Sequence, residues 1–177
     1  MKEMLALQPQ GPYYLLGWSM GGALVLEMAS LLERLGREVA WVGLIDGYIP
    51  GAGHRSVENN PESSPEGVAQ DEWQQLLDVE RHMRRLARAH ERVKPLRAPV
   101  HAWWAKQSPE SNDNAEALLT AFIGCKPASS VWIDTHHLGI VRHPEFLESM
   151  PRSLEANSNS TVGADGMKVG RSGEPVG

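Results

Sequence analysis

Ser19 has the clearest potential for chemistry, because it lies at the centre of the pentad GWSMG, residues 17–21. A short apolar run, residues 13–16, precedes this pentad, and a pattern with helical spacing follows it directly. A serine in a Gly-x-Ser-x-Gly turn between a strand and a helix is exposed and can act as a nucleophile. We expect glycine to be required at both Gly17 and Gly21, because a Cβ atom at either position would collide with neighbouring backbone.

Two further groups could complete a catalytic set with Ser19. Asp46 directly follows the apolar run 39–45, and acids at the carboxyl end of a buried parallel strand lie where sites form in open α/β sheets. A histidine pair at 136–137 follows the last apolar run, so the chain order is Ser, Asp, His. Asp113, after the expected strand 98–106, is the alternative acid, and either histidine of the pair could be the base.

Alternating strand and helix patterns must position these residues. Strands are expected at 13–16, 38–45, 98–106 and 130–133, and the continuous apolar run of the second suits a parallel strand covered on both faces. Helices are expected at 1–10, 20–35, 71–93, 114–123 and 144–153, with Gly36 and Gly124 ending two of them. The helix after Ser19 should bury one apolar face, made of Leu24, Val25, Met28, Leu31, Leu32 and Leu35.

Composition limits the function classes. A chain of 177 residues is long enough for one core, and its net charge of −5 implies no bulk affinity for nucleic acid. No signal peptide and no run long enough to span a membrane is evident. Cys125 is the single cysteine, so we interpret it as a small apolar filler in a reducing cytoplasm. Neither histidine of the pair has Cys or carboxylate residues spaced for a metal site.

The stretch 11–50, GPYYLLGWSMGGALVLEMASLLERLGREVAWVGLIDGYIP, closely resembles the integrated thioesterase domains that end nonribosomal peptide synthetase and polyketide synthase assembly lines. Those domains are α/β-hydrolases, and the resemblance continues more weakly to Met150. It implies that Ser19 is the nucleophile, Asp46 the acid and His137 the base, with the Met20 N–H in the oxyanion hole. The family usually has Gly-Asp-His-Phe where residues 135–138 read THHL, which leaves His136 open as the base.

The same resemblance implies a function. A thioesterase of this kind releases a peptidyl or acyl chain from the 4′-phosphopantetheine thioester of a carrier protein, by hydrolysis or cyclisation, through a serine-linked acyl-enzyme. It would need no cofactor or metal of its own and neither nucleic acid nor membrane as partner. The alternatives are an inactive or partner-dependent fragment, and a stand-alone editing thioesterase or serine esterase.

The family also implies a domain organisation. Several strands normally precede the first one seen here, so residues 1–153 are expected to form a partial α/β-hydrolase fold that lacks the first strands. The strand 13–16 would then be an exposed edge, and the second oxyanion-hole donor would not come from this chain. Residues 51–94 would combine a lid with a connecting helix, whose basic face either attracts an acidic carrier protein or is merely solvated; it comprises Arg81, Arg84, Arg85, Arg88 and Arg92. Residues 154–177 are expected to be a disordered tail.

Overall fold

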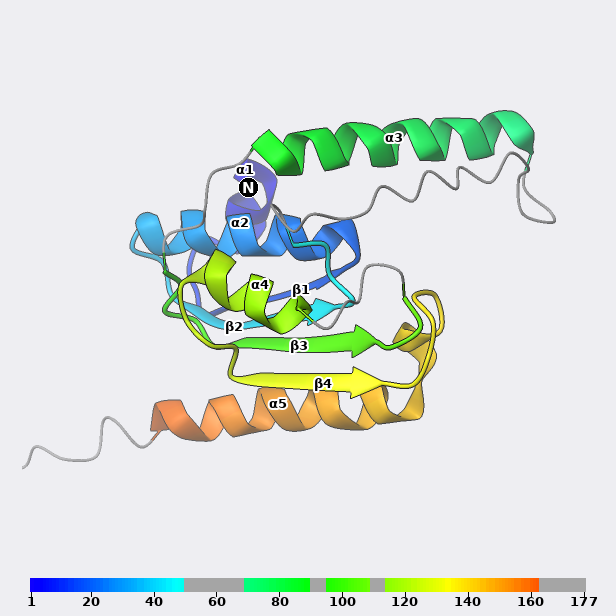
Figure 1. Ribbon diagram of the computed structural model, residues 1–177. Coiled ribbons are helices and arrows are strands. Elements are labelled where there is room, and N and C mark those ends of the chain that lie inside the picture. The colour runs from blue at the N-terminus through cyan, green and yellow to red at the C-terminus, as the bar shows by residue number, and fades with distance from the viewer. Residues whose placement is uncertain (50–68, 90–94, 109–113, 163–177) are drawn as a thin grey trace, which may run out of the picture.

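A four-stranded parallel sheet forms the centre of the protein (Figure 1), in a computed structural model that describes residues 1–49, 69–89, 95–108 and 114–162. Its strand order is that of the chain: β1 (Tyr13–Trp18), β2 (Val39–Ile45), β3 (Val100–Ala105) and β4 (Ser129–Ile133). All three strand pairs are parallel. The expected α/β class, a parallel sheet flanked by helices, is confirmed, and all carboxyl ends of the strands lie along one edge.

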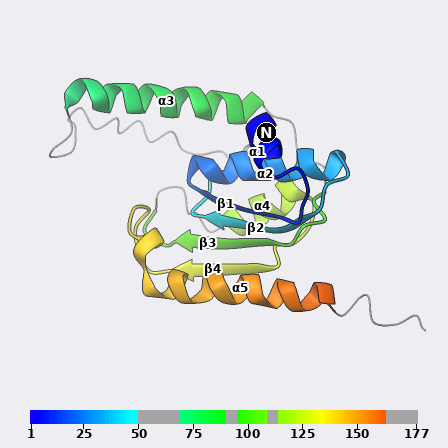
Figure 2. The same ribbon diagram turned by 180° about the vertical axis from the view of Figure 1, so that it is seen from behind.

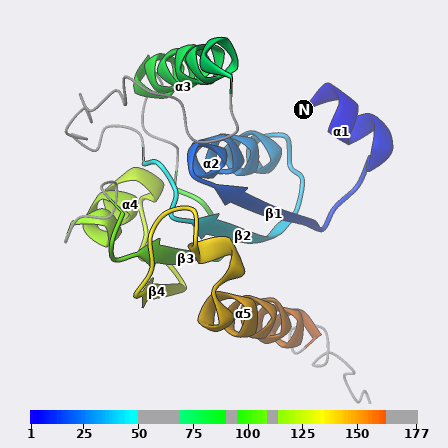
Figure 3. The ribbon, with the colours of Figure 1, turned by 90° about the vertical axis from the view of Figure 1, so that its right-hand side faces the viewer.

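Helices cover the two faces of the sheet unequally. The helices are α1 (Lys2–Leu7), α2 (Met20–Arg34), α3 (Gln70–Ala89), α4 (Ala115–Ile123), the 3-10 turn η1 (Ile140–Arg142) and α5 (Pro144–Val162). Helices α2 and α4 lie on one face, and α5 lies on the other, as Figure 2 and Figure 3 show. Helix α3 lies outside α2 and not on the sheet. No helix in the described part of the chain is long and apolar enough to cross a membrane.

The sheet separates two apolar clusters, because side chains alternate between its faces. On the side of α2 and α4, Val42, Ala102 and Trp104 belong to the larger cluster. On the side of α5, Trp41 and Trp103 pack in the smaller one. Strands β2 and β3 are therefore buried along their whole length, as the apolar run of β2 predicted.

The face that α2 buries overlaps the expected one only in part: Val25 and Leu32 are buried as expected. Leu24 and Leu35 are 49% and 56% exposed, whereas the small residues Ala23 and Ala29 are buried together with Leu26. Helix α2 is apolar almost all round, so spacing alone did not distinguish its faces. The face with small residues faces the sheet because it allows the closest approach; a Cβ atom on Gly22 would stand only 2.9 Å from the Cα of Gly47.

The terminal helix is longer than predicted. Helix α5 runs from Pro144 to Val162, so the first nine residues of the expected disordered tail are helical. Side-chain contacts explain the extension: the Trp41 indole donates to the Ser153 hydroxyl at 3.2 Å, and Leu154 packs on the cluster beneath the sheet. The rest of the tail, 163–177, lies outside the described residues, as do 50–68 and 90–94 of the expected lid region.

Strand β1 is the least covered strand. Among the described residues it has a strand neighbour on one side only, and its side chains alternate between buried and exposed. Tyr14, Leu16 and Trp18 are 49%, 46% and 39% exposed; they lie on the α5 side of the sheet, where α5 does not cover β1. This open edge was expected from the sequence, and it leaves apolar surface next to Ser19.

Candidate active site

Ser19, Asp46 and His137 come from three different segments that end at the same edge of the sheet. Ser19 directly follows β1, Asp46 directly follows β2, and His137 lies in the loop after β4. Parallel strands bring their carboxyl ends together, and this edge is where ligands bind in open α/β sheets. The three predicted residues are therefore positioned by the fold and not by proximity in the chain.

The backbone at Ser19 has the conformation of a strained turn. Its φ of 54° and ψ of −124° lie in a region that residues with a side chain rarely adopt. Three backbone hydrogen bonds hold it there: the Ser19 N–H donates to the Ile45 carbonyl at 3.0 Å, and its carbonyl accepts the N–H groups of Gly22 and Tyr48, each at 2.9 Å. This is the strand–turn–helix geometry expected of an exposed nucleophile.

Glycine is required at Gly17 but not, on steric grounds, at Gly21. A Cβ atom on Gly17 would stand 2.2 Å from the carbonyl oxygen of Gly21, closer than any real contact. No described atom lies within 4 Å of the place where a Cβ atom of Gly21 would stand, so that expectation was wrong. The tight contact on the helix side is made by Gly22 against Gly47.

Asp46 is buried and its two carboxylate oxygens have different partners. Oδ1 accepts the backbone N–H of Ala105 at 3.0 Å, and Oδ2 lies 2.6 Å from Nδ1 of His137. The Asp46 residue is 1% exposed, and its own N–H donates to the Trp103 carbonyl at 2.7 Å. A buried carboxylate at this distance fixes the tautomer of the imidazole, with Nδ1 carrying the proton.

The structure distinguishes between the two adjacent histidines. His137 pairs with Asp46, and its side chain is 23% exposed. His136 is exposed, and its Nδ1 accepts the Gly139 N–H at 3.2 Å within the same turn. The alternative acid Asp113 lies outside the described residues. The sequence could not distinguish the two residues, because both are histidines. They differ in the direction in which each side chain leaves the loop.

Sequence reasoning missed one residue at this edge. The indole of Trp18 stacks on the His137 imidazole, with ring centroids 5.2 Å apart and planes inclined by 25°. The only signal in the sequence is the place of Trp18 directly before Ser19. The strand that ends next to Ser19 therefore also contacts His137.

Met20, the expected oxyanion-hole residue, is the first residue of α2. N–H groups in the first turn of a helix have no intrahelical partner, and the helix dipole favours negative charge there. The amide of Met20 is thus suited to stabilise an oxyanion formed next to Ser19.

His101 is the most buried of the other described histidines. It lies in β3, is 7% exposed, and its Nδ1 is 2.8 Å from the Ser129 hydroxyl. Its ring stacks on both Trp41 and Trp103, with ring centroids 5.8 and 6.5 Å apart. Burial lowers the pKa of His101, which agrees with the predicted packing role. Burial, with Glu33 nearby, raises the pKa of the Cys125 thiol, which disfavours the reactive thiolate.

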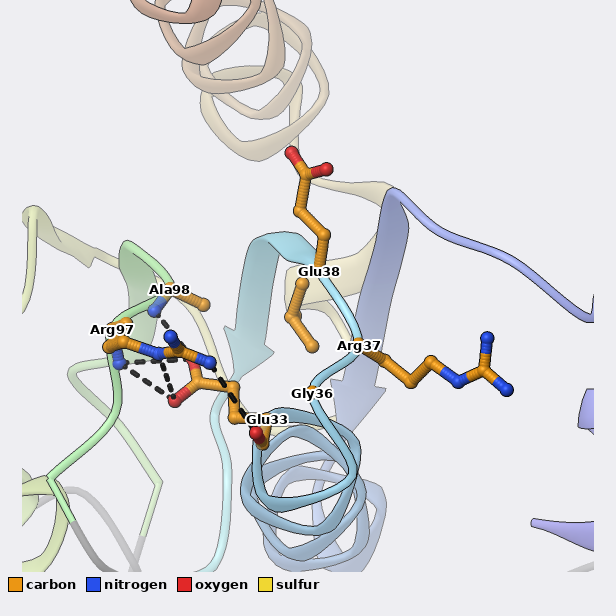
Figure 4. Close-up of a pocket in the computed structure, with 7 residues that line it drawn as sticks. Glu33, Gly36, Arg37, Glu38, Arg97 and Ala98 are labelled. Carbon is orange, nitrogen blue, oxygen red and sulfur yellow. Dashed lines mark hydrogen bonds and ion pairs between the residues drawn. The ribbon is translucent and has the colours of Figure 1, made fainter.

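A cavity of about 290 Å³ lies at the other end of α2, away from Ser19 (Figure 4). Glu33 dominates its chemistry: one carboxylate oxygen accepts the N–H groups of both Arg97 and Ala98, at 3.0 and 2.8 Å. These bonds attach the end of α2 to the segment before β3, so we interpret them as structural. Within the described residues no three His, Cys, Asp or Glu side chains gather in a metal-binding arrangement.

Comparisons with known proteins agree with this geometry. Residues 1–130 match the family model described as thioesterase domain. A dimodular nonribosomal peptide synthase of Bacillus subtilis (strain 168) is 46% identical over 48 residues, 27% of this chain and 2% of that protein. Vanchrobactin synthetase VabF of Vibrio anguillarum is 27% identical over 137 residues, 67% of this chain and 5% of that one. The matched part is thus a few per cent of each synthetase.

A solved structure has the same fold. The NocB thioesterase domain, in covalent complex with a fluorophosphonate nocardicin G analog, superposes with a TM-score of 0.59 at 24% identity, over 88% of this chain and 70% of that chain. The similarity is one of fold, a parallel sheet with its helices. Because the family model covers most of the chain, we conclude that the protein belongs to the thioesterase domain family.

Proposed function

We propose that this protein hydrolyses or transfers acyl thioesters by Ser-His-Asp chemistry. Ser19 Oγ attacks the thioester carbonyl while Nε2 of His137 takes its proton, and the N–H of Met20 stabilises the oxyanion. The C–S bond then breaks, and the protonated His137 gives its proton to the leaving thiolate. Water, or an internal amine or hydroxyl of the acyl chain, next attacks the Ser19 ester with His137 as base, and Ser19 is regenerated.

One observation carries this proposal: the 2.6 Å contact between the buried Asp46 carboxylate and His137, at the edge where Ser19 adopts its strained turn. An ion pair alone would be a weak argument, since many are structural. A serine with φ of 54° at the same edge, held by three backbone hydrogen bonds, is an independent sign of function.

The relatives suggest the substrate class. Of the two relatives named above, the one with 46% identity is a nonribosomal peptide synthase and the one with 27% identity is vanchrobactin synthetase. We therefore propose that the acyl or peptidyl chain arrives as a thioester on the 4′-phosphopantetheine of a carrier protein or carrier domain. The protein would need no cofactor of its own. With one cysteine in the chain, we propose a cytoplasmic location.

Labelling of purified protein with a fluorophosphonate probe tests the nucleophile. We expect one adduct by intact mass, mapped to Ser19, and none in Ser19→Ala. The matched control is Ser30→Ala, which removes a buried serine of the same helix segment away from the edge and should leave labelling intact. A well-folded wild-type protein without an adduct would contradict the proposal.

A second candidate function follows from the open edge of β1. Among the described residues, β1 is an edge strand, and its side chains Tyr14, Leu16 and Trp18 are exposed. In this candidate function, the chain becomes active only when another polypeptide pairs with β1. Labelling that appears only after addition of a carrier-containing synthetase segment would favour this candidate. Labelling of the isolated chain would exclude it.

A further inference from the structure

The strand–turn–helix geometry around Ser19 does not by itself require a tryptophan at Trp18. Within the pentad, steric contacts require glycine only at Gly17. The side chain of Trp18 lies on the outer face of β1. The Trp18 residue is only partly buried there, with 39% of its surface exposed. Its specific contact is the stack on His137, with ring centroids 5.2 Å apart.

The geometry points to Trp18 as a positioning residue for His137: its indole fixes the plane of the imidazole and favours the protonated ring. The contribution to catalysis rests on the function proposed above, whereas the contact and its effect on protonation do not. Trp18 acts through His137 and is not itself a catalytic residue.

The first part of the inference follows from what one hydrogen bond can and cannot restrain. The contact between Asp46 Oδ2 and Nδ1 fixes one atom of the ring, yet the ring can still pivot about that axis. A face-to-face contact inclined by 25° restrains this pivot. Nε2 is then aimed by two partners together, and rate depends steeply on such aim.

The sheet couples these two partners rigidly. Trp18 of β1 is paired in register with Ile45 of β2, the residue directly before Asp46. The backbone segments that carry the indole and the carboxylate are therefore joined by a parallel ladder, and His137 contacts both side chains from the loop after β4. Sites built on strands are more precise than sites built on loops.

The second part concerns charge. The face of an indole attracts a cation through its negative quadrupole, and tryptophan does so more strongly than phenylalanine. His137 becomes an imidazolium during acyl transfer, so Trp18 would stabilise the charged form together with Asp46. Removing the indole should make His137 easier to deprotonate.

Histidine NMR titration tests the contact without any need for activity. We would compare wild type with Trp18→Leu, which keeps apolar bulk, and Trp18→Phe, which keeps a ring, and assign His137 with His137→Gln. The matched control is Tyr14→Leu, the same kind of loss on the same exposed face of β1. In Trp18→Leu we expect the ring-current shift of His137 to disappear and its titration midpoint to fall by about half a pH unit.

Fluorophosphonate labelling across pH tests the role in aiming the base. We expect the rate constant to fall about tenfold in Trp18→Leu, with its acidic limb moved to lower pH, and to recover largely in Trp18→Phe. Tyr14→Leu should match wild type. Circular dichroism checks folding, and if Trp18→Leu does not fold, the smaller changes in Trp18→Phe decide.

Three results would overturn the inference: an unchanged His137 titration in Trp18→Leu, an unchanged labelling rate in a protein that labels, or an equal loss in Tyr14→Leu. A wild-type protein that does not label, but whose His137 titration depends on Trp18, would contradict the proposed function while supporting the contact.

Discussion

Two histidines of this protein have similar immediate surroundings and different positions. Both His137 and His101 stack on tryptophan, and both have Nδ1 hydrogen-bonded to a side-chain oxygen, at 2.6 and 2.8 Å. His101 lies within β3 against the Ser129 hydroxyl, whereas His137 lies in a loop at the carboxyl edge against the Asp46 carboxylate.

The difference in partner and position distinguishes His137, the proposed base, from His101, a packing residue. A buried imidazole with a neutral partner is held uncharged, and burial lowers the pKa of His101 accordingly. A carboxylate partner can stabilise an imidazolium, which a proton-transfer step requires. Aromatic stacking and a hydrogen bond at Nδ1 are common to both histidines, so the assignment of His137 as the proposed base rests on its charged partner Asp46 and on its place at the same edge of the sheet as Ser19.

Replacing His137 should give the largest effect on activity. In His137→Gln we expect kcat for hydrolysis of a soluble acyl thioester to fall by about 10⁶-fold, since serine enzymes lose that much without their base. Release of free thiol measures the rate. The parallel change His136→Gln should have little effect, because His136 is exposed and bonds only within its own turn. The opposite ranking would reverse the assignment of the base.

Asp46→Asn should come next, with a fall in kcat of about 10⁴-fold, because an amide can hold the imidazole in the wrong tautomer. The same thioester assay applies. Asp134→Asn is the matched control: this exposed carboxylate in the loop before His137 accepts a hydrogen bond from Gln107. Equal losses in both variants would indicate a disturbed loop and not a lost acid.

His101→Ala should affect stability and spare activity. The change leaves a cavity beside Trp41 and Trp103 and removes the partner of Ser129, which we expect to cost about 3 kcal/mol in the free energy of unfolding. Urea denaturation measures it. The exposed His82→Ala should change stability by less than about 0.5 kcal/mol. A large loss of thioesterase rate in folded His101→Ala would contradict the assignment of a packing role to His101 and of the catalytic role to His137.

The pH dependence of stability should show the smallest effect. Because the pKa of His101 is lowered in the folded protein, the unfolded chain binds more protons between that value and about 6.5. Stability should therefore rise with pH across this window and level off above it. Urea midpoints from pH 4.5 to 7.5 measure the slope. His101→Phe keeps a ring without titration and should lose this part of the slope; an unchanged slope would contradict the assignment.

Features encoded within a short window were predictable. The strand, turn and helix around Ser19, and the apolar strand before Asp46, were expected from spacing and are present. Gly36, with φ of 69°, ends α2 as predicted, and the Arg37 N–H closes the turn on the Leu32 carbonyl at 2.8 Å. These features depend on neighbours in the chain, so the sequence contains them.

Features that depend on packing were not predictable from spacing. The buried face of α2 combines the small residues Ala23 and Ala29 with Leu26 and Leu32, whereas Leu24 is left exposed. Helix α5 continues past its expected end because Ser153 and Leu154 find partners beneath the sheet. In both elements the local pattern allowed several outcomes, and contacts with other elements selected one.

The sequence alone thus determined the order Ser19, Asp46, His and the strands that end next to the first two, since each signal lies within a few residues. Only the tertiary structure decided that His137, and not His136, contacts Asp46. His137 and Asp46 are 91 positions apart in the chain, and the side chains of the two adjacent histidines leave the loop in different directions. The same packing brought Trp18 against His137. A hydrogen bond and a ring contact depend on fractions of an ångström and on angle, and those are set only when β1, β2 and the loop after β4 are assembled.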